Sequence, residues 1–277
     1  MFGKGWDMFS CIRVSAIAFL FSSFLALPSQ ASQNSEQLEV TPPPLHHSEP
    51  PNSASAPDEL ERRGDQLRME KNFLDAIDYY QTALKGAPDA ASLFNKIGMC
   101  QLMMRRGKEA KKNFERAIKA DRNHADAYSN LGVAYYEVHN YSAAIKNYEK
   151  AISLRNDAGS YYSNLGAAYF AKKQFEKAIQ SYSKAVELDP DIFERSSHAG
   201  VQARLASPED RAHYDYVLAK LYAKTGVPDR SLHYLKKALE EGYKNINDVY
   251  KDNEFSELRK DPRFAELMAA KTLAIPN

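Results

Sequence analysis

The chain has 277 residues, of which 44% are hydrophobic, and its 37 Lys and Arg residues are nearly balanced by 36 Asp and Glu residues. This balance excludes the large basic excess that is typical of proteins coating phosphate backbones or anionic membranes, so nucleic acid is not expected as a partner. The length fits one large domain or two small ones, and the internal order of the sequence must decide between them.

The first 31 residues have the pattern of a secretory signal peptide. A short basic segment precedes an apolar run over residues 14–27, and the small residues Ser29 and Ala31 mark a cleavage site after Ala31. The run is shorter than the roughly 18 residues that an α-helix needs to cross a membrane, which favours cleavage over a permanent anchor. We therefore expect an exported protein, periplasmic or extracellular, with no integral membrane span in the mature chain.

Residues 32–56 are predicted to form a disordered linker. The segment is rich in Ser, Pro, Gln and Glu, and the proline runs at 42–44 and 50–51 interrupt any helix. Such a composition cannot bury enough apolar surface to fold alone. It predicts a spacer between the signal peptide and whatever domain begins at residue 57.

A 34-residue repeat organises the middle of the chain. The segment Tyr-Ser-Asn-Leu-Gly-Val-Ala-Tyr at 128–135 returns as Tyr-Ser-Asn-Leu-Gly-Ala-Ala-Tyr at 162–169, and the same frame extends back to residue 57. This pattern resembles the tetratricopeptide repeat, which has a 34-residue period with a Leu-Gly pair, aromatic residues and alanines at fixed places. That resemblance implies an all-α fold, a right-handed helical solenoid with two antiparallel helices per repeat, and it predicts four repeats over 57–190.

Small residues recur at one place in each predicted helix. They are Gly98, Gly132 and Gly166 in the first helices, and Ala110, Ala144 and Ala178 in the second helices. Because a glycine inside a helix costs about 1 kcal/mol relative to alanine, its recurrence at one place indicates close packing. We expect the glycines to face the alanines where the two helices of a repeat cross, with the aromatic residues filling the gaps between repeats.

The period is interrupted at residues 191–207, which we predict to be an irregular insertion. It carries Phe193, Arg195, His198, Val201, Arg204 and Leu205. Two interpretations remain open: the insertion lies at the edge of the binding groove between the fourth and fifth repeats, or it is only a spacer.

The repeat pattern returns after the insertion. Ser207-Pro208-Glu209-Asp210 has the composition of a helix start, and it begins a fifth, degenerate repeat over 208–245. Residues 246–277 are predicted to form short C-terminal capping helices, of one or two turns each, and a tail.

Motifs of catalysis and metal binding are missing from the sequence. It has no Gly-rich phosphate loop, no His-Glu-x-x-His, no Cys-x-x-Cys and no Gly-x-Ser-x-Gly. We therefore expect no enzymatic activity, no cofactor and no metal site. Cys100, the one cysteine left after cleavage, shares its place in the repeat with Ala134 and Ala168, which predicts a packed thiol.

The resemblance implies a concave groove lined by the first helix of each repeat. Its predicted peptide-binding residues are Asn95, Met99, Met103, Ser129, Asn130, Val133, Tyr136, Ser163, Asn164, Ala167 and Phe170. Asn130 and Asn164, one repeat apart, resemble an asparagine ladder that holds a peptide backbone, although asparagine is also common there as simple consensus. Met99 and Met103 are equally compatible with binding and with core packing. Most of this face is neutral, so a clamp for a terminal carboxylate is not expected.

Two functions fit these patterns. The first is an adapter of the cell envelope that holds an extended segment of another protein in the groove. The second is a structural component that assembles with itself or with an envelope complex through its outer faces. The sequence thus predicts a protein or an extended peptide as partner and leaves homo-oligomers possible.

Overall fold

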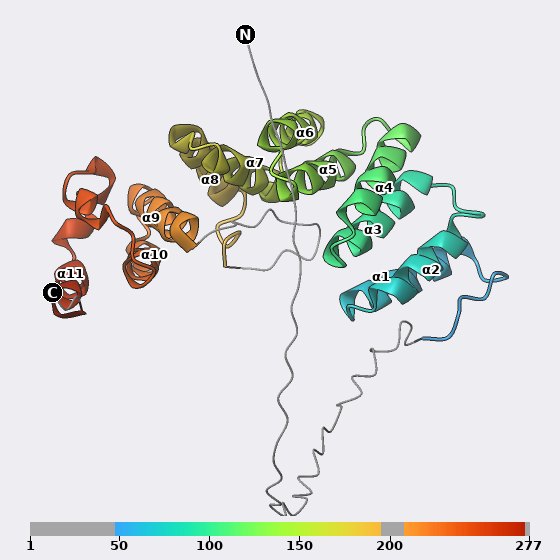
Figure 1. The fold of residues 1–277 in the computed structure, drawn as a ribbon, viewed down its shortest axis with the longest axis horizontal. Coiled ribbons are helices and arrows are strands. Elements are labelled where there is room, and N and C mark those ends of the chain that lie inside the picture. The colour runs from blue at the N-terminus through green and yellow to red at the C-terminus, as the bar shows by residue number, and fades with distance from the viewer. Residues whose placement is uncertain (1–47, 195–207, 275–277) are drawn as a thin grey trace, which may run out of the picture. The chain divides into compact units, whose positions relative to one another are not determined.

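The computed structural model describes residues 48–194 and 208–274, all of which belong to one compact unit. Within these ranges the regular elements are helices, with no strands, and they follow one another as antiparallel pairs (Figure 1). The pairs are α1 (Pro57–Met69) with α2 (Phe73–Ala83), α3 (Ala90–Met103) with α4 (Gly107–Ala120), α5 (Ala125–Glu137) with α6 (Tyr141–Leu154), α7 (Gly159–Ala171) with α8 (Phe175–Leu188), and α9 (Pro208–Lys224) with α10 (Pro228–Glu240). The all-α solenoid of five helix pairs that the repeat predicted is confirmed.

The turn between the two helices of a pair has the same backbone conformation in each repeat. In each of the first four pairs, the second residue after the end of the first helix adopts a left-handed conformation, with φ between 59° and 66°. These residues are Lys71, Arg105, His139 and Lys173. Only the fifth pair uses a glycine, Gly226, at this place. The left-handed residue ends the first helix and reverses the chain, so the second helix packs back on the first.

A glycine in the first helix lets an aromatic ring of the second helix lie against its backbone. A Cβ atom added to Gly132 would lie 2.5 Å from the Tyr148 ring, and the same holds for Gly98 with Phe114. The expectation that the glycines face alanines was therefore wrong. The rings fill the space inside each repeat, between its own two helices, because only a residue without a side chain leaves room for a flat ring.

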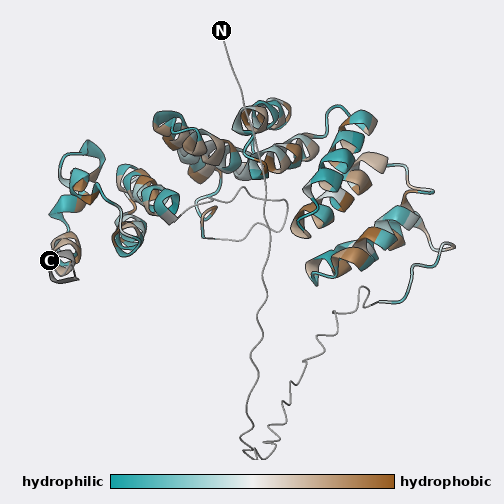
Figure 2. Cartoon of the chain, viewed as in Figure 1, coloured by the Kyte–Doolittle hydropathy of each residue, from teal (hydrophilic) through white to brown (hydrophobic). Residues whose placement is uncertain are grey.

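The second helices, such as α4 and α6, bury one apolar side, whereas α3, α5 and α7 are buried on most sides. The buried side chains form successive hydrophobic clusters along the helix pairs. The sides are visible as brown stripes on helices that are otherwise teal (Figure 2). Ala110, Ala144 and Ala178 are completely buried, as are Phe114 and Tyr148. Each pair also contacts the next pair, so a repeat that could not bury its apolar side alone is stabilised by its neighbours.

The C-terminal segment caps the fifth pair. Three short 3-10 helices, Ile246–Tyr250, Asn253–Phe255 and Leu258–Lys260, lead into α11 (Pro262–Ala274). Phe255 is completely buried, and Tyr216 of α9 donates a hydrogen bond to Asp252 at 2.8 Å. The capping elements lie where they were expected, but α11 has 13 residues and is longer than the one or two turns predicted.

Two predicted irregular segments take part in the fold at their ends. Residues 48–56, the end of the expected disordered linker, lie against the first pair, where the Tyr79 hydroxyl donates to the backbone oxygen of Glu49 at 3.2 Å. Ile192, in the expected insertion, is 6% exposed, and the ring of Phe193 lies 5.4 Å from that of Tyr182. Ile192 therefore belongs to the core, and the half-buried Phe193 packs against it. The other named residues of the insertion lie outside the described ranges.

Candidate functional site

The predicted binding face lies on the first helices of the second, third and fourth pairs. α3 contacts α5, and α5 contacts α7, so these helices lie side by side along one face of the array. All eleven predicted groove residues lie on these three helices. The repeat frame therefore places them on neighbouring surfaces.

Most of these side chains are buried. Met103 is 46% exposed and Ser163 is half-buried, whereas Asn95, Met99, Ser129, Asn130, Val133, Tyr136, Asn164, Ala167 and Phe170 are each less than 7% exposed. Met99 is thus a core residue in this structure, and Met103 is a surface residue. The sequence could place these residues on one helix face, but it could not tell how deeply neighbouring helices would cover them.

Asparagine side chains connect α3 and α5 within this face. The Asn130 side-chain amide donates a hydrogen bond to the side-chain oxygen of Asn95 at 3.0 Å. The amide group of Asn95 in turn lies 3.9 Å from the sulfur of Met99, which is a weak acceptor. Asn164 stands one repeat further along and is 2% exposed. Asn130 and Asn164 thus hold the same place in successive repeats, whereas Asn95 stands one place earlier in its repeat and Lys96 holds the matching place.

Lys96, the cation nearest to these amides in the sequence, is held by the first repeat. Its ammonium group lies 2.7 Å from Glu61 and 2.6 Å from Asp65, and Asp65 also accepts a hydrogen bond from the Tyr80 hydroxyl at 2.8 Å. The Lys96 side chain is 22% exposed. Because its charge is already paired, this lysine stabilises the junction between the first two repeats and is not available to grip a peptide carboxylate.

An aromatic cluster that the sequence did not predict joins the fourth and fifth pairs. The His213 ring lies 4.3 Å from Phe175 and 5.2 Å from both Phe170 and Tyr243. Burial lowers the pKa of His213, which favours the neutral ring. The offset between the fourth and fifth repeats is not 34 residues, because the insertion lies between them, so sequence spacing gave no signal for these contacts.

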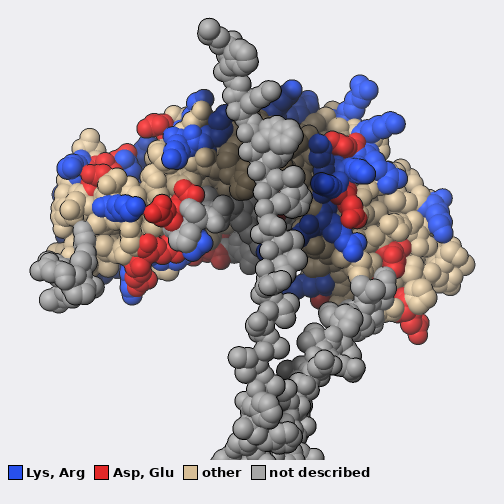
Figure 3. Space-filling view, in the orientation of Figure 1, with Lys and Arg blue, Asp and Glu red and all other residues tan. Residues whose placement is uncertain are grey.

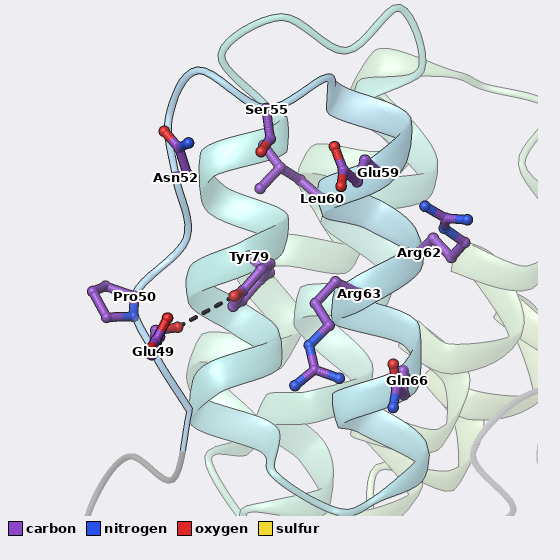
Figure 4. Close-up of a pocket in the computed structure, with 10 residues that line it drawn as sticks. All are labelled: Glu49, Pro50, Asn52, Ser55, Glu59, Leu60, Arg62, Arg63, Gln66 and Tyr79. Carbon is purple, nitrogen blue, oxygen red and sulfur yellow. Dashed lines mark hydrogen bonds between the residues drawn. The ribbon is translucent and has the colours of Figure 1, made fainter.

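A pocket of about 510 Å³ lies at the N-terminal end of the array (Figure 4). Residues 49–55 form one wall, and α1 and α2 form the other, with Arg63, Gln66 and Tyr79 among the lining side chains. Arg63 stands where the next three repeats carry Ile97, Leu131 and Leu165. A polar side chain suits an end of the array, because no further repeat covers this place.

Within 48–194 and 208–274, no three His, Cys, Asp or Glu side chains gather as metal ligands would. Cys100 is completely buried, and burial raises the pKa of its thiol to about 12, which keeps it protonated and unreactive. None of the helices in these ranges is long and apolar enough to cross a membrane.

Two family models match the chain, and both describe the tetratricopeptide repeat. One matches residues 125–157 and 160–192, and the other matches residues 102–138. The first two matches coincide with the third and fourth helix pairs. None of the curated proteins compared with the chain matches it.

Solved structures with the same kind of helix array are similar to this chain at low sequence identity. A structure of PilF from Pseudomonas aeruginosa has a TM-score of 0.52 at 18% identity and covers 78% of this chain and 89% of its own. A tetratricopeptide protein of the thermophile Thermus thermophilus has a TM-score of 0.49 at 20% identity, covering 77% of this chain and 100% of its own. A MamA structure has a TM-score of 0.44 at 25% identity, covering 64% and 93%.

Proposed function

Since the chain is a tetratricopeptide repeat protein, and this family provides scaffolds for protein–protein interaction, we propose that it is a non-enzymatic adapter of the cell envelope. Its partner is an extended segment of another protein, held along the face of α3, α5 and α7. The envelope location rests on the signal-peptide pattern of residues 1–31.

The observation that carries the proposal is the series of amides at Asn95, Asn130 and Asn164. An asparagine side chain offers both a donor and an acceptor, so it can pair with a peptide group whatever side chain that peptide carries. The Asn95 amide group faces the sulfur of Met99, and a peptide carbonyl is a much better acceptor than a thioether. An extended segment would thus gain hydrogen bonds at this face without requiring a particular sequence.

The burial of the same face favours a second function, a structural component of an envelope complex. In the present structure Asn130 and Asn164 are 3% and 2% exposed, so a peptide must displace neighbouring groups before it reaches them. If no displacement occurs, the array acts through its outer surfaces and the amides only stabilise the packing of the first helices.

One experiment separates the two functions. The protein is isolated from the envelope of its own cells, its N-terminus is sequenced, and the same preparation is used to capture partners. We expect the mature chain to begin at Ser32, and we expect Asn130→Ala combined with Asn164→Ala to reduce the captured partner strongly. The matched control is Asn147→Ala combined with Asn156→Ala, on the second helix of the third pair and the loop after it.

Two outcomes would contradict parts of this proposal, and a third would show that the variants are unstable. Retention of Met1 or Met8 would contradict cleavage at Ala31. Equal capture by the face variant and the control would contradict binding along α3, α5 and α7, and it would favour the structural component. Loss of capture by both variants would point to instability of the third and fourth repeats, which circular dichroism would reveal.

A further inference from the structure

The second repeat carries a local positive charge that the neutral total of the chain conceals. Residues 91–124 contain nine Lys and Arg residues and three Asp and Glu residues, whereas residues 125–158 contain three and four. In the region of α4, Lys and Arg side chains gather on the surface, with fewer acidic side chains among them (Figure 3). The charge is therefore concentrated on one helix pair.

Three lysines on α4 form a stripe that faces solvent. Lys108, Lys112 and Lys119 are all exposed, and within the described ranges they form no ion pair. The nearby carboxylates are engaged elsewhere: Glu109 lies 3.9 Å from Arg106, and Glu115 lies 3.7 Å from Lys111. The stripe thus presents three uncompensated ammonium groups over about 17 Å of helix.

The fold does not require these lysines. At the places of Lys108 and Lys119, α6 carries Ser142 and Ser153, and α8 carries Glu176 and Glu187. Those helices have the same length as α4 and the same packing. Neutral and acidic residues at the places of Lys108 and Lys119 are therefore compatible with the same helix pair, and these two lysines need another explanation. At the place of Lys112, α6 keeps a lysine, Lys146, and α8 carries Gln180.

Two of the lysines stand where they are locally unfavourable. Lys108 is in the first turn of α4, where the helix dipole favours negative charge, and the corresponding residues of α8 and α10 are Glu176 and Asp229. Lys112 follows Lys108 by four residues, so the two like charges repel each other on one helix face. A sequence that keeps unfavourable charges at an exposed site indicates a function for them.

We propose that the solvent face of α4 binds an acidic segment of a partner protein, with Lys108, Lys112 and Lys119 each pairing with a carboxylate. The span of the stripe matches about five residues of extended chain, so a short run of acidic residues is sufficient. This surface is separate from the face of α3, α5 and α7, and it does not depend on the peptide-binding role proposed for that face.

A protein segment fits this surface better than a membrane or a nucleic acid. Membrane-surface helices need large apolar side chains beside their cations, and no exposed large apolar side chain lies on α4. A nucleic acid duplex needs a basic surface larger than one helix, and the neighbouring repeats do not supply it: residues 57–90 carry eight acidic and five basic residues, and residues 125–158 carry four and three. A short acidic peptide needs only the surface of α4.

The test is binding of a fluorescent peptide of eight glutamates to the whole protein, measured by anisotropy at low and high salt. We compare the wild type with the triple variant Lys108→Ser, Lys112→Gln and Lys119→Ser, whose new residues occur at the same places in α6 and α8. The control variant also loses three positive charges, but from α6 and α8. It combines Lys146→Gln, Lys150→Gln and Lys177→Gln. Peptides of eight serines, phosphatidylglycerol vesicles and a 20-base-pair duplex are measured in parallel.

We expect the glutamate peptide to bind the wild type in a salt-sensitive way. The α4 variant should bind about ten-fold more weakly, as the loss of three exposed charge pairs implies, and the control should change less than about two-fold. Both variants should keep the helical circular dichroism and the melting temperature of the wild type. The proposal is overturned if the wild type does not bind the glutamate peptide, if both variants lose affinity equally, or if vesicles or the duplex bind at least as tightly as the peptide.

Discussion

The central and terminal repeats of this protein share one skeleton but differ in their buried polar groups. In both the first and the third repeat a glycine of the first helix faces a tyrosine ring, Gly64 with Tyr80 and Gly132 with Tyr148. The Tyr80 hydroxyl donates to Asp65, whereas the buried Tyr148 hydroxyl has no hydrogen-bond partner among the described residues. The difference follows from the sequence, because Val133 stands in the third repeat where Asp65 stands in the first.

The fifth repeat also differs in the two residues that meet where its helices cross. Ala219 and Leu235 stand there at the places of the glycine and the ring, and both are completely buried. The branched Leu235 side chain leaves room for the Ala219 methyl group, which a flat ring at the place of Leu235 would exclude. The helix crossing therefore needs a complementary pair of residues and not one fixed residue. The fifth repeat changes the pair itself, whereas the first repeat keeps the pair and changes a polar neighbour of the ring.

The largest effect on stability is expected from Asp215 of the fifth repeat. At the same place the other repeats carry an apolar or aromatic residue: Leu60, Phe94, Tyr128 or Tyr162. Asp215 is 5% exposed, and burial raises the pKa of its carboxyl to about 6 from an ordinary value of 3.8, although Lys237 partly opposes this shift. The folded state thus holds this proton more tightly than the unfolded state. The contribution of Asp215 to stability should therefore fall as the pH rises from about 4 to about 6, by about 3 kcal/mol.

The variant Asp215→Asn, which is neutral at every pH, should remove this slope. It should be more stable than the wild type at pH 7, by up to about 3 kcal/mol, and nearly equal to it at pH 4. Urea denaturation at pH 4, 5, 6 and 7 measures the difference. Parallel pH profiles of wild type and variant would show that Asp215 titrates alike in the folded and unfolded chain.

The next largest effect on stability is expected at the contact between Gly132 and the Tyr148 ring in the third repeat. Gly132→Val should cost about 1 to 3 kcal/mol of unfolding free energy, because its side chain would overlap the buried Tyr148 ring. Gly107→Ala is the control, since a Cβ atom there meets nothing within 4 Å. Combining Gly132→Ala with Tyr148→Leu copies the fifth repeat and should recover part of the loss of Gly132→Ala alone. An unchanged unfolding midpoint for Gly132→Val would contradict the packing described.

The sequence predicted the helix pairs because the 34-residue period records a packing unit that each repeat must satisfy in the same way. It placed Gly132 at a close contact but assigned the wrong neighbour, since spacing alone cannot tell which side of the second helix faces the first. The contacts of His213 were missed because the insertion breaks the period.

The candidate site was predicted less completely than the fold. The period placed Asn130 and Asn164 on one face, yet their burial depends on how neighbouring helices meet, which no single repeat encodes. The charge of α4 was hidden for a different reason: a balance taken over the whole chain averages the positive second repeat with the acidic first repeat. Local charge must be counted for each repeat to reveal such a surface.

The smallest expected effect tests the two tyrosine hydroxyls directly. Tyr80→Phe removes the hydrogen bond to Asp65 and should cost about 0.5 to 1.5 kcal/mol of unfolding free energy. Tyr148→Phe removes a buried hydroxyl that has no partner in the described structure, so stability should be unchanged or slightly higher. Phe114 already occupies this place in the second repeat, which shows that a phenyl ring fits there. Chemical denaturation of both variants gives the comparison, and an equal loss in the two would mean that the Tyr148 hydroxyl is hydrogen-bonded in solution and that the central and terminal repeats do not differ here.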